Sequence, residues 1–201
     1  MSLVSEILAE NGERVCILTR GYGRKNVAER VVVSNWDKVL ADAATGGDEP
    51  VELAERLIGK AVVIADRNRV SAARFALSEF SPTAFVLDDG FQHRRAKRDL
   101  DIVCIDATNP FGNREIIPSG PLRESMKNLG RADAFVITRT EQVDSTAAIE
   151  TEIRSYAADA PIFTARTVLE TLLPFNGALP DEDPKYYAFC GIGNPKNFFD
   201  L

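Results

Sequence analysis

Two adjacent carboxylates stand directly behind an apolar run in the segment FVLDDGFQHRR, residues 85–95. Asp88 and Asp89 repel each other, so the pair is costly unless a cation offsets the charge or water solvates both groups. A divalent ion such as Mg²⁺ takes oxygen ligands and would supply that positive charge. The pair therefore has two open interpretations: a metal-binding acid cluster, or two solvated acids at the end of a strand.

Other polar residues lie close to this pair or repeat its pattern. His93 is the only histidine in the chain, and Gln92 and Arg94 flank it. An apolar strand that ends in an acid is typical of the second phosphate motif of nucleotide hydrolases and kinases, in which the acid holds Mg²⁺. A second acidic pair, Asp48 and Glu49 in TGGDEP, is expected where a loop enters a helix.

Two basic turns could bind an anion. The segment RGYGRK offers Arg20, Arg24 and Lys25 as donors, unless it is only a flexible basic turn. The segment DRNR offers Arg67 and Arg69, which point the same way if the backbone there is extended. Otherwise these two arginines are ordinary surface charges at the start of a helix.

The polar turns follow short apolar runs that predict strands. The runs are RVCILT, AVVIA, TAFVL, DIVCI and DAFVIT, at residues 14–19, 61–65, 83–87, 101–105 and 133–138. Such runs suit a parallel sheet covered by helices on both faces, and apolar residues at three- and four-residue steps between them predict the helices. The predicted fold is a doubly wound α/β domain with a mostly parallel sheet. Ligands bind beyond the carboxyl ends of such strands, so Arg20, Arg67, Asp88 and Asp106 are expected along one edge.

A change of composition near the end of the chain predicts a domain boundary. The stretch LLPFNGALPDEDPKYY is rich in proline, glycine and acids, which favours a linker or hairpin over residues 172–186. Residues 1–171 would then form the main domain. Residues 187–201, which resemble a strand, a glycine-rich turn and a helix start, would begin a second, smaller α/β domain that is cut short.

Composition and charge exclude several classes of protein. The chain has 201 residues and a formal net charge of −6, whereas a nucleic-acid binder shows a basic excess. Cys16, Cys104 and Cys190 are far apart in apolar runs, which indicates buried thiols in a reducing compartment. No apolar run approaches the roughly 20 residues of a membrane span, and no signal peptide opens the chain. A cytoplasmic location is the default expectation.

Taken in order, five motifs resemble those of the tetraacyldisaccharide 4'-kinase family, the lipid A 4'-kinases of Gram-negative bacteria. These motifs are TRGYGRK, GGDEP, DDGFQHRR, NPFGN…PSGPLRE and GIGNPKNFF. The resemblance implies a P-loop-type α/β kinase that transfers the γ-phosphate of ATP, with Mg²⁺, to the 4'-hydroxyl of the tetraacylated glucosamine disaccharide 1-phosphate. It also implies peripheral contact with the cytoplasmic side of the inner membrane, the chain itself being soluble.

The resemblance further implies roles for individual positions. Asp48 matches the acid that assists deprotonation of the sugar hydroxyl, and Glu49 stands beside it at the nucleotide. Asp88 and Asp89 match the pair that handles the metal and the nucleophile, and His93 joins them among the catalytic residues. The positions implied to face the sugar or the phosphates are Arg20, Tyr22, Arg67, Arg69, Gln92 and Arg123.

The sequence also departs from the family pattern. No GxxxxGK[ST] phosphate loop occurs in the 201 residues, and the family's DHH motif and amino-terminal membrane helix are not found. The chain is therefore expected to be a partial or inactive form that binds ATP weakly, because the backbone donors and lysine of that loop are missing. A non-catalytic module for a glycolipid or sugar phosphate is the alternative. A metal hydrolase is disfavoured, since such enzymes use several histidine or acid ligands.

Overall fold

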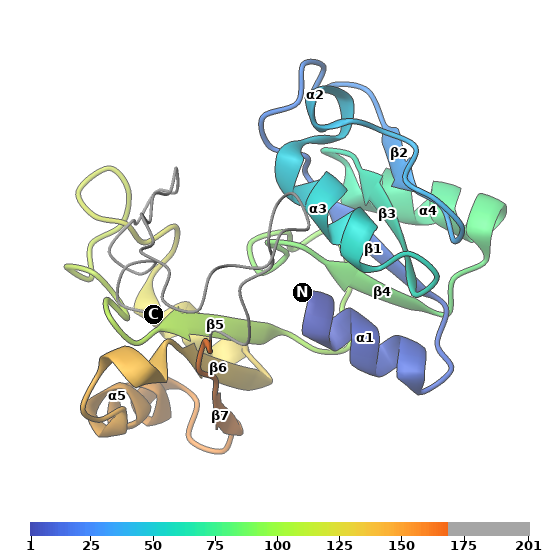
Figure 1. Ribbon diagram of the computed structural model, residues 1–201. Helices are drawn as coiled ribbons and strands as arrows, with labels where there is room; N and C mark the ends of the chain where they lie inside the picture. The colour runs from blue at the N-terminus through green and yellow to red at the C-terminus, as the bar shows by residue number, and fades with distance from the viewer. Residues whose placement is uncertain (169–201) are drawn as a thin grey trace, which may run out of the picture. The chain divides into compact units, whose positions relative to one another are not determined.

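A computed structural model describes residues 1–168 of the chain (Figure 1). It divides the chain into two compact units, Met1–Lys97 and Arg98–Leu201, and each is described by itself. The predicted linker at 172–186 and the predicted second domain at 187–201 lie outside the described residues.

The first unit is built on a four-stranded sheet with the order β2-β3-β1-β4. Strands β1 (Val15–Thr19), β3 (Ala61–Ala65) and β4 (Ala84–Leu87) are parallel, and all three were predicted. Strand β2 (Val31–Ser34) was not predicted, and it runs antiparallel along the outer side of β3. Its apolar run is only three residues long and stands in a polar loop, so it gives a weak strand signal.

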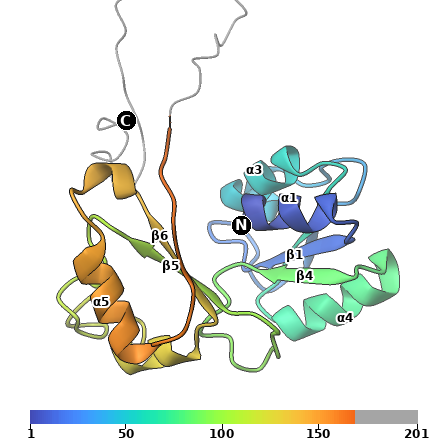
Figure 2. The same cartoon turned by 90° about the horizontal axis from the view of Figure 1, so that it is seen from below.

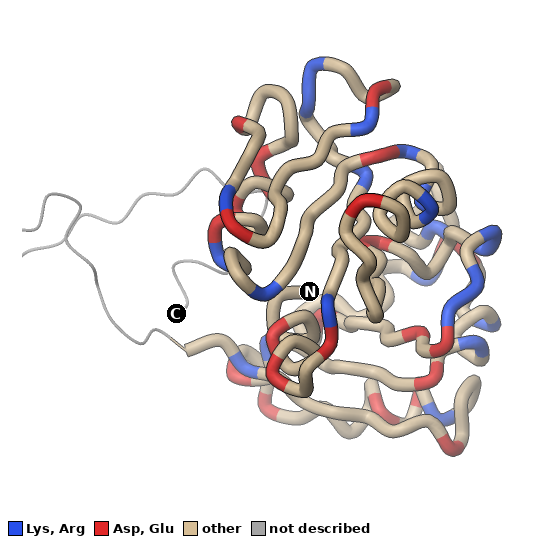
Figure 3. The backbone as a smooth tube through the Cα atoms, turned by 90° about the vertical axis from the view of Figure 1, so that its right-hand side faces the viewer, with Lys and Arg blue, Asp and Glu red and all other residues tan. Residues whose placement is uncertain are grey.

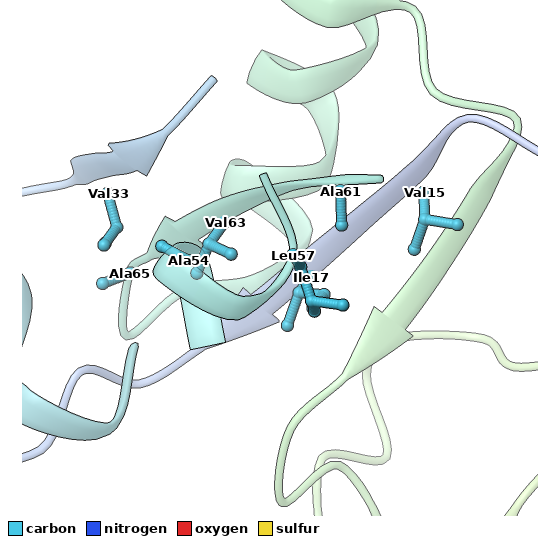
Figure 4. Close-up of a cluster of buried hydrophobic side chains, with 8 residues drawn as sticks. All are labelled: Val15, Ile17, Val33, Ala54, Leu57, Ala61, Val63 and Ala65. Atoms are coloured by element: carbon cyan, nitrogen blue, oxygen red, sulfur yellow. The ribbon is translucent and has the colours of Figure 1, made fainter. Parts of the chain in front are cut away.

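Helices cover both faces of this sheet because alternate strand residues point to opposite sides. On one face, Ile17 of β1 and Val63 of β3 pack with Leu57, which follows helix α3 (Asp48–Arg56) (Figure 4). Helix α1 (Ser2–Glu10) adds Leu8 and Ala9 to the same cluster. On the other face, helix α4 (Arg69–Phe80) packs Ala72 and Ala76 against Cys16 and Leu18 (Figure 2).

The buried strands hold the unit together. Every residue of β1 and β3 is buried, as expected for parallel strands covered on two faces. Fully burying one side chain the size of Ile17 or Leu57 stabilises a fold by about 1.5–3 kcal/mol. The turns that follow these strands therefore start from rigid ends.

The second unit has its own sheet. Its parallel strands are β5 (Ile102–Asp106), β6 (Ala134–Thr138) and β7 (Ile162–Thr164), in that order. Helix α5 (Ala147–Tyr156) contributes the buried Ile149 and Ile153, and two short 3₁₀ helices, η1 (Met126–Arg131) and η2 (Thr140–Gln142), follow β5 and β6.

The α/β class and the mostly parallel pairing are confirmed, whereas the expected single sheet is wrong. All five predicted strands exist, but among the described residues they belong to two sheets. An apolar run shows that a segment is a strand and says nothing about which strand lies beside it. Asp106 therefore ends a different sheet from Asp88.

Charged residues of both signs are scattered along the backbone (Figure 3). None of the helices in residues 1–168 combines the length and the apolarity that crossing a bilayer requires.

The cysteines differ from the expectation that all are buried. Cys16 is buried in β1, but Cys104 is exposed on β5, and Cys190 lies outside the described residues. Burial raises the pKa of Cys16 to about 12. Because the unfolded thiol ionises near pH 8.5, the contribution of this burial to stability is present below that pH and is lost as pH rises toward 12.

The two thiols should therefore differ in reactivity. In the native protein at about pH 8, a disulfide reagent such as DTNB should modify Cys104 readily and leave Cys16 intact, because the thiolate is the nucleophile. In denaturant both should react. Peptide mass spectrometry locates the label on each cysteine separately, and native labelling of Cys16 at the rate of Cys104 would contradict the burial of β1.

Candidate functional site

The carboxyl ends of three parallel strands form one edge of the first unit's sheet. Thr19 of β1 is opposite Ala65 of β3, and Leu18 is opposite Leu87 of β4. Main-chain bonds extend this register into the turns, since Asp66 N donates to Thr19 O at 3.0 Å and Asp88 N donates to Leu18 O at 3.0 Å. The turns that carry Arg20, Arg67 and Asp88 therefore begin side by side.

Asp88 is tied to this edge by a side-chain hydrogen bond. The Thr19 hydroxyl donates to Asp88 Oδ2 at 2.9 Å. Asp89, by contrast, is exposed and has a left-handed backbone with φ of 50°. The next residue, Gly90, packs so closely that a Cβ there would be 2.8 Å from Leu87 Cβ. This tight turn gives two adjacent acids different surroundings.

Arg69 joins the turn after β3 to the turn after β4. It is only 4% exposed and donates to Asp66 O at 2.7 Å and to Asp88 O at 3.2 Å. Burial lowers the pKa of its guanidinium, and the charge of Arg20 lowers it further, while Asp88, Asp89 and Asp66 raise it. The side chain is thus directed at main-chain carbonyls, and its predicted contact with substrate stays a prediction.

Arg24 was expected to donate hydrogen bonds to a bound anion, but its surroundings argue against that role. It is 4% exposed, and its guanidinium donates to main-chain carbonyls instead of facing solvent. The neighbouring Lys25 and the predicted site residue Arg20 are exposed. A run of basic residues in the sequence does not show which guanidinium is buried.

An ion pair that the sequence analysis missed supports the same edge. Asp66 is 8% exposed and accepts from Arg30 Nε at 2.9 Å, while Arg30 Nη2 donates to the Ser71 hydroxyl at 2.5 Å. Asp66 Oδ1 also accepts from Asn68 N at 2.8 Å. The signal was available, because Asp66 follows a buried strand just as Asp88 does.

The RGYG turn rests against the start of helix α3, where Asp48 lies. A Cβ placed on Gly23 would be 3.8 Å from Asp48 Oδ1, and one placed on Gly47 would be 2.8 Å from Tyr22 O. Asp48 and its neighbour Glu49 are exposed in the first turn of the helix, where the helix dipole favours negative charge. Tyr22 is 73% exposed. Residues 25 sequence positions apart thus form one surface.

The remaining predicted residues lie on the turns after β3 and β4 or in the second unit. His93 N donates to Gly90 O at 2.8 Å, which closes the turn, and the His93 side chain is partly buried while Gln92 is exposed. Arg67 is exposed next to Asp66. Arg123 is exposed between β5 and η1 in the second unit. The first unit therefore contains every predicted site residue except Arg123.

The acids at this edge fit Mg²⁺ in the chemistry of their oxygen donors. Among residues 1–168, no three histidine, cysteine or acidic side chains come together as a complete metal site. Asp88 and Asp89 offer hard oxygen donors, and Mg²⁺ is commonly held by one or two carboxylates together with waters and substrate phosphates. Two carboxylates are thus a sufficient protein contribution for that ion.

The fold and this edge define a parallel α/β protein whose charged residues gather where such proteins bind phosphates. Over residues 1–201 the chain matches the family described as LpxK, tetraacyldisaccharide-1-P 4'-kinase. The chain belongs to this family, which confirms the resemblance of its motifs.

Relatives of known name support the assignment. The chain is 36% identical over 202 residues to the tetraacyldisaccharide 4'-kinase of Desulfotalea psychrophila, covering 97% of this chain and 57% of that protein. It is 47% identical over 144 residues to the enzyme of the same name from Anaeromyxobacter sp. strain Fw109-5, covering 72% and 38%. The crystal structure of LpxK from Aquifex aeolicus in complex with ATP shares the fold, with a TM-score of 0.62, 36% identity, and coverage of 71% and 44%. The chain spans about half the length of the curated relatives it matches.

The contact between Gly47 and Tyr22 can be tested with a pair of glycines. Gly47 and Gly59 both have a positive φ, of 94° and 78°, so a Cβ strains the backbone at either position. Only at Gly47 does it also meet an atom, Tyr22 O at 2.8 Å, whereas nothing lies within 4 Å at Gly59. Gly47→Ala should lower the free energy of unfolding by about 1–3 kcal/mol more than Gly59→Ala.

Urea unfolding followed by circular dichroism measures both variants. Equal losses for Gly47→Ala and Gly59→Ala would show that the RGYG turn does not lie against the start of α3.

Proposed function

We propose that this chain serves ATP-dependent phosphorylation of the 4'-hydroxyl of tetraacyldisaccharide 1-phosphate, a precursor of lipid A, as the part that holds the acceptor and the catalytic acids. One observation carries the proposal: the first unit gathers Asp48, Asp88 and exposed arginines at the carboxyl edge of one sheet. Phosphoryl transfer asks a protein mainly for positioning and charge neutralisation, together with an acid that takes the hydroxyl proton.

Each group then has a part that its surroundings allow. Asp48, exposed at the start of α3, accepts the proton of the sugar hydroxyl, with Glu49 beside it at the nucleotide. Asp88 and Asp89 would hold Mg²⁺, which when bound neutralises charge on the ATP phosphates. His93, on the turn after the acids, joins this catalytic group.

The exposed cations suit the anionic parts of the reactants. Arg20, Tyr22 and Arg67 extend from the same edge and can meet a phosphorylated sugar, and guanidinium groups bind phosphate with paired donors. The exposed Gln92 and Arg123 and the buried Arg69 complete the proposed set. Because the acceptor is a lipid, the proposal includes peripheral contact with the cytoplasmic face of the inner membrane.

A second candidate is a module that binds the glycolipid or a sugar phosphate without turnover. One sequence observation favours it, the lack of a GxxxxGK[ST] motif among these 201 residues. The two candidates share the acceptor site and differ in whether phosphate is transferred.

Substitution of the paired acids separates catalysis from folding. In the full-length Desulfotalea psychrophila relative, the matching segment is replaced by residues 1–201 of this chain. In this hybrid protein, Asp88→Asn and Asp89→Asn are compared with Asp37→Asn, which changes an exposed acid distant from the pair in sequence. The acid-pair variants should keep their melting temperature, because two carboxylates side by side repel each other. Their rate of ATP-dependent lipid phosphorylation should fall about 10²–10⁴-fold, whereas Asp37→Asn should change neither quantity.

The measurements are thermal melting and transfer of radiolabelled phosphate on the same preparations. Normal turnover in both acid variants would show that Asp88 and Asp89 are solvated acids at a strand end with no part in catalysis. An exchanged protein that binds the lipid but transfers no phosphate would favour the non-catalytic module.

A further inference from the structure

Arg24 is a buried cation that the proposed reaction does not use. It is 4% exposed, and within the part of the chain that the structure describes its guanidinium donates only to main-chain carbonyls. Nη1 donates to Ala65 O at 3.0 Å and to Glu29 O at 2.7 Å, and Nη2 donates to Val27 O at 3.0 Å. One side chain thus joins the last residue of β3 to the loop that leads into β2.

The shape of the RGYG turn depends on this side chain. Gly21 has a φ of 66°, and a Cβ there would lie 2.9 Å from Arg24 Cδ and 2.9 Å from Ala65 Cβ. Gly21 is therefore pressed against both the arginine and the end of β3. The Arg24 side chain thus lies directly against Gly21 in the turn.

The RGYG turn also contacts the start of α3, where the proposed catalytic acid Asp48 lies. Its residues Tyr22 and Gly23 meet Gly47 and Asp48 at the start of α3, while Arg20 stands exposed at its beginning. A shift of the turn would move Arg20 and Tyr22 relative to Asp48. Burying a charge is costly, and a planar guanidinium with several fixed donors is the group best suited to repay that cost by holding carbonyls in place.

We propose that Arg24 is a positioning residue, whose buried guanidinium holds the RGYG turn so that Arg20 and Tyr22 face a sugar phosphate beside Asp48. The nature of the ligand rests on the proposed function. The contacts between Arg24 and the turn lie within the first unit and do not depend on the ligand, so the two can be tested separately.

The test uses the 201-residue chain and the deacylated glucosamine disaccharide 1-phosphate as the probe. Isothermal titration is carried out at a temperature at which every variant is fully folded. A variant that only loses stability then still binds the probe with wild-type affinity. Arg24→Met should weaken binding about tenfold, the loss of about one charge-assisted bond to the phosphate. Arg24→Lys should be weakened as well, because one ammonium nitrogen replaces the two separate nitrogens, Nη1 and Nη2, that bond these carbonyls.

Lys38→Met is the matched control, since it removes the same charge from an exposed residue outside the RGYG turn. It should change affinity by less than about twofold, because exposed charges are screened by salt. Amide shifts in ¹H–¹⁵N spectra report the turn directly, and Arg24→Met should shift Gly21, Gly23 and Asp48 while Lys38→Met leaves Gly21 and Asp48 in place.

The outcomes decide the proposal separately from the function. Wild-type affinity and unshifted Gly21 and Asp48 amides in Arg24→Met would overturn the positioning role. If the wild-type chain does not bind the probe, the proposed function is in doubt, and the amide shifts alone then support or overturn the role of Arg24. If Arg24→Met fails to fold, Arg24→Lys gives the decision, and wild-type affinity in that variant overturns the proposal.

Discussion

Two buried guanidinium groups hold the turns at the carboxyl edge of the first sheet. Arg24 donates to the carbonyl that ends β3, and Arg69 donates to the carbonyls of Asp66 and Asp88 in the turns after β3 and β4. A carbonyl at a strand end has lost its partner in the ladder and must find a donor when it is buried. One planar guanidinium donates to several such carbonyls at once, so it links neighbouring turns to each other.

This arrangement divides the basic residues of the edge into two kinds. Arg24 and Arg69 are buried and satisfy the main chain, while Arg20 and Arg67 are exposed in the same short motifs. The inward cations also lie near Asp66 and Asp88, which reduces the cost of burying charge of either sign. The outward cations are exposed to solvent, and Asp88 at the same edge accepts a hydrogen bond from the Thr19 hydroxyl.

The sequence was sufficient for the features that depend on local pattern. The runs at Val15–Thr19 and Ala61–Ala65 are apolar throughout, and a strand with no polar face has to be buried on both sides. Parallel pairing then brings the residues after each strand to one edge, which explains why the juxtaposition of Arg20 with Asp88 could be expected from spacing alone. The role of each residue in a reaction is a different matter, because it depends on ligands that no strand pattern specifies.

Features that depend on distant partners could not be predicted. Cys104 has the same apolar neighbours in sequence as Cys16, yet one is exposed and the other buried, because strand partners and covering helices differ between the two sheets. Arg20 and Arg24 stand in one six-residue motif, and the second is buried against main-chain carbonyls that lie outside that motif. Gly21 leaves room for the Arg24 side chain beside the backbone, and any larger residue would fill that room. The motif RGYGRK therefore combines an exposed arginine that can meet a ligand with a buried arginine that fixes where the first one stands.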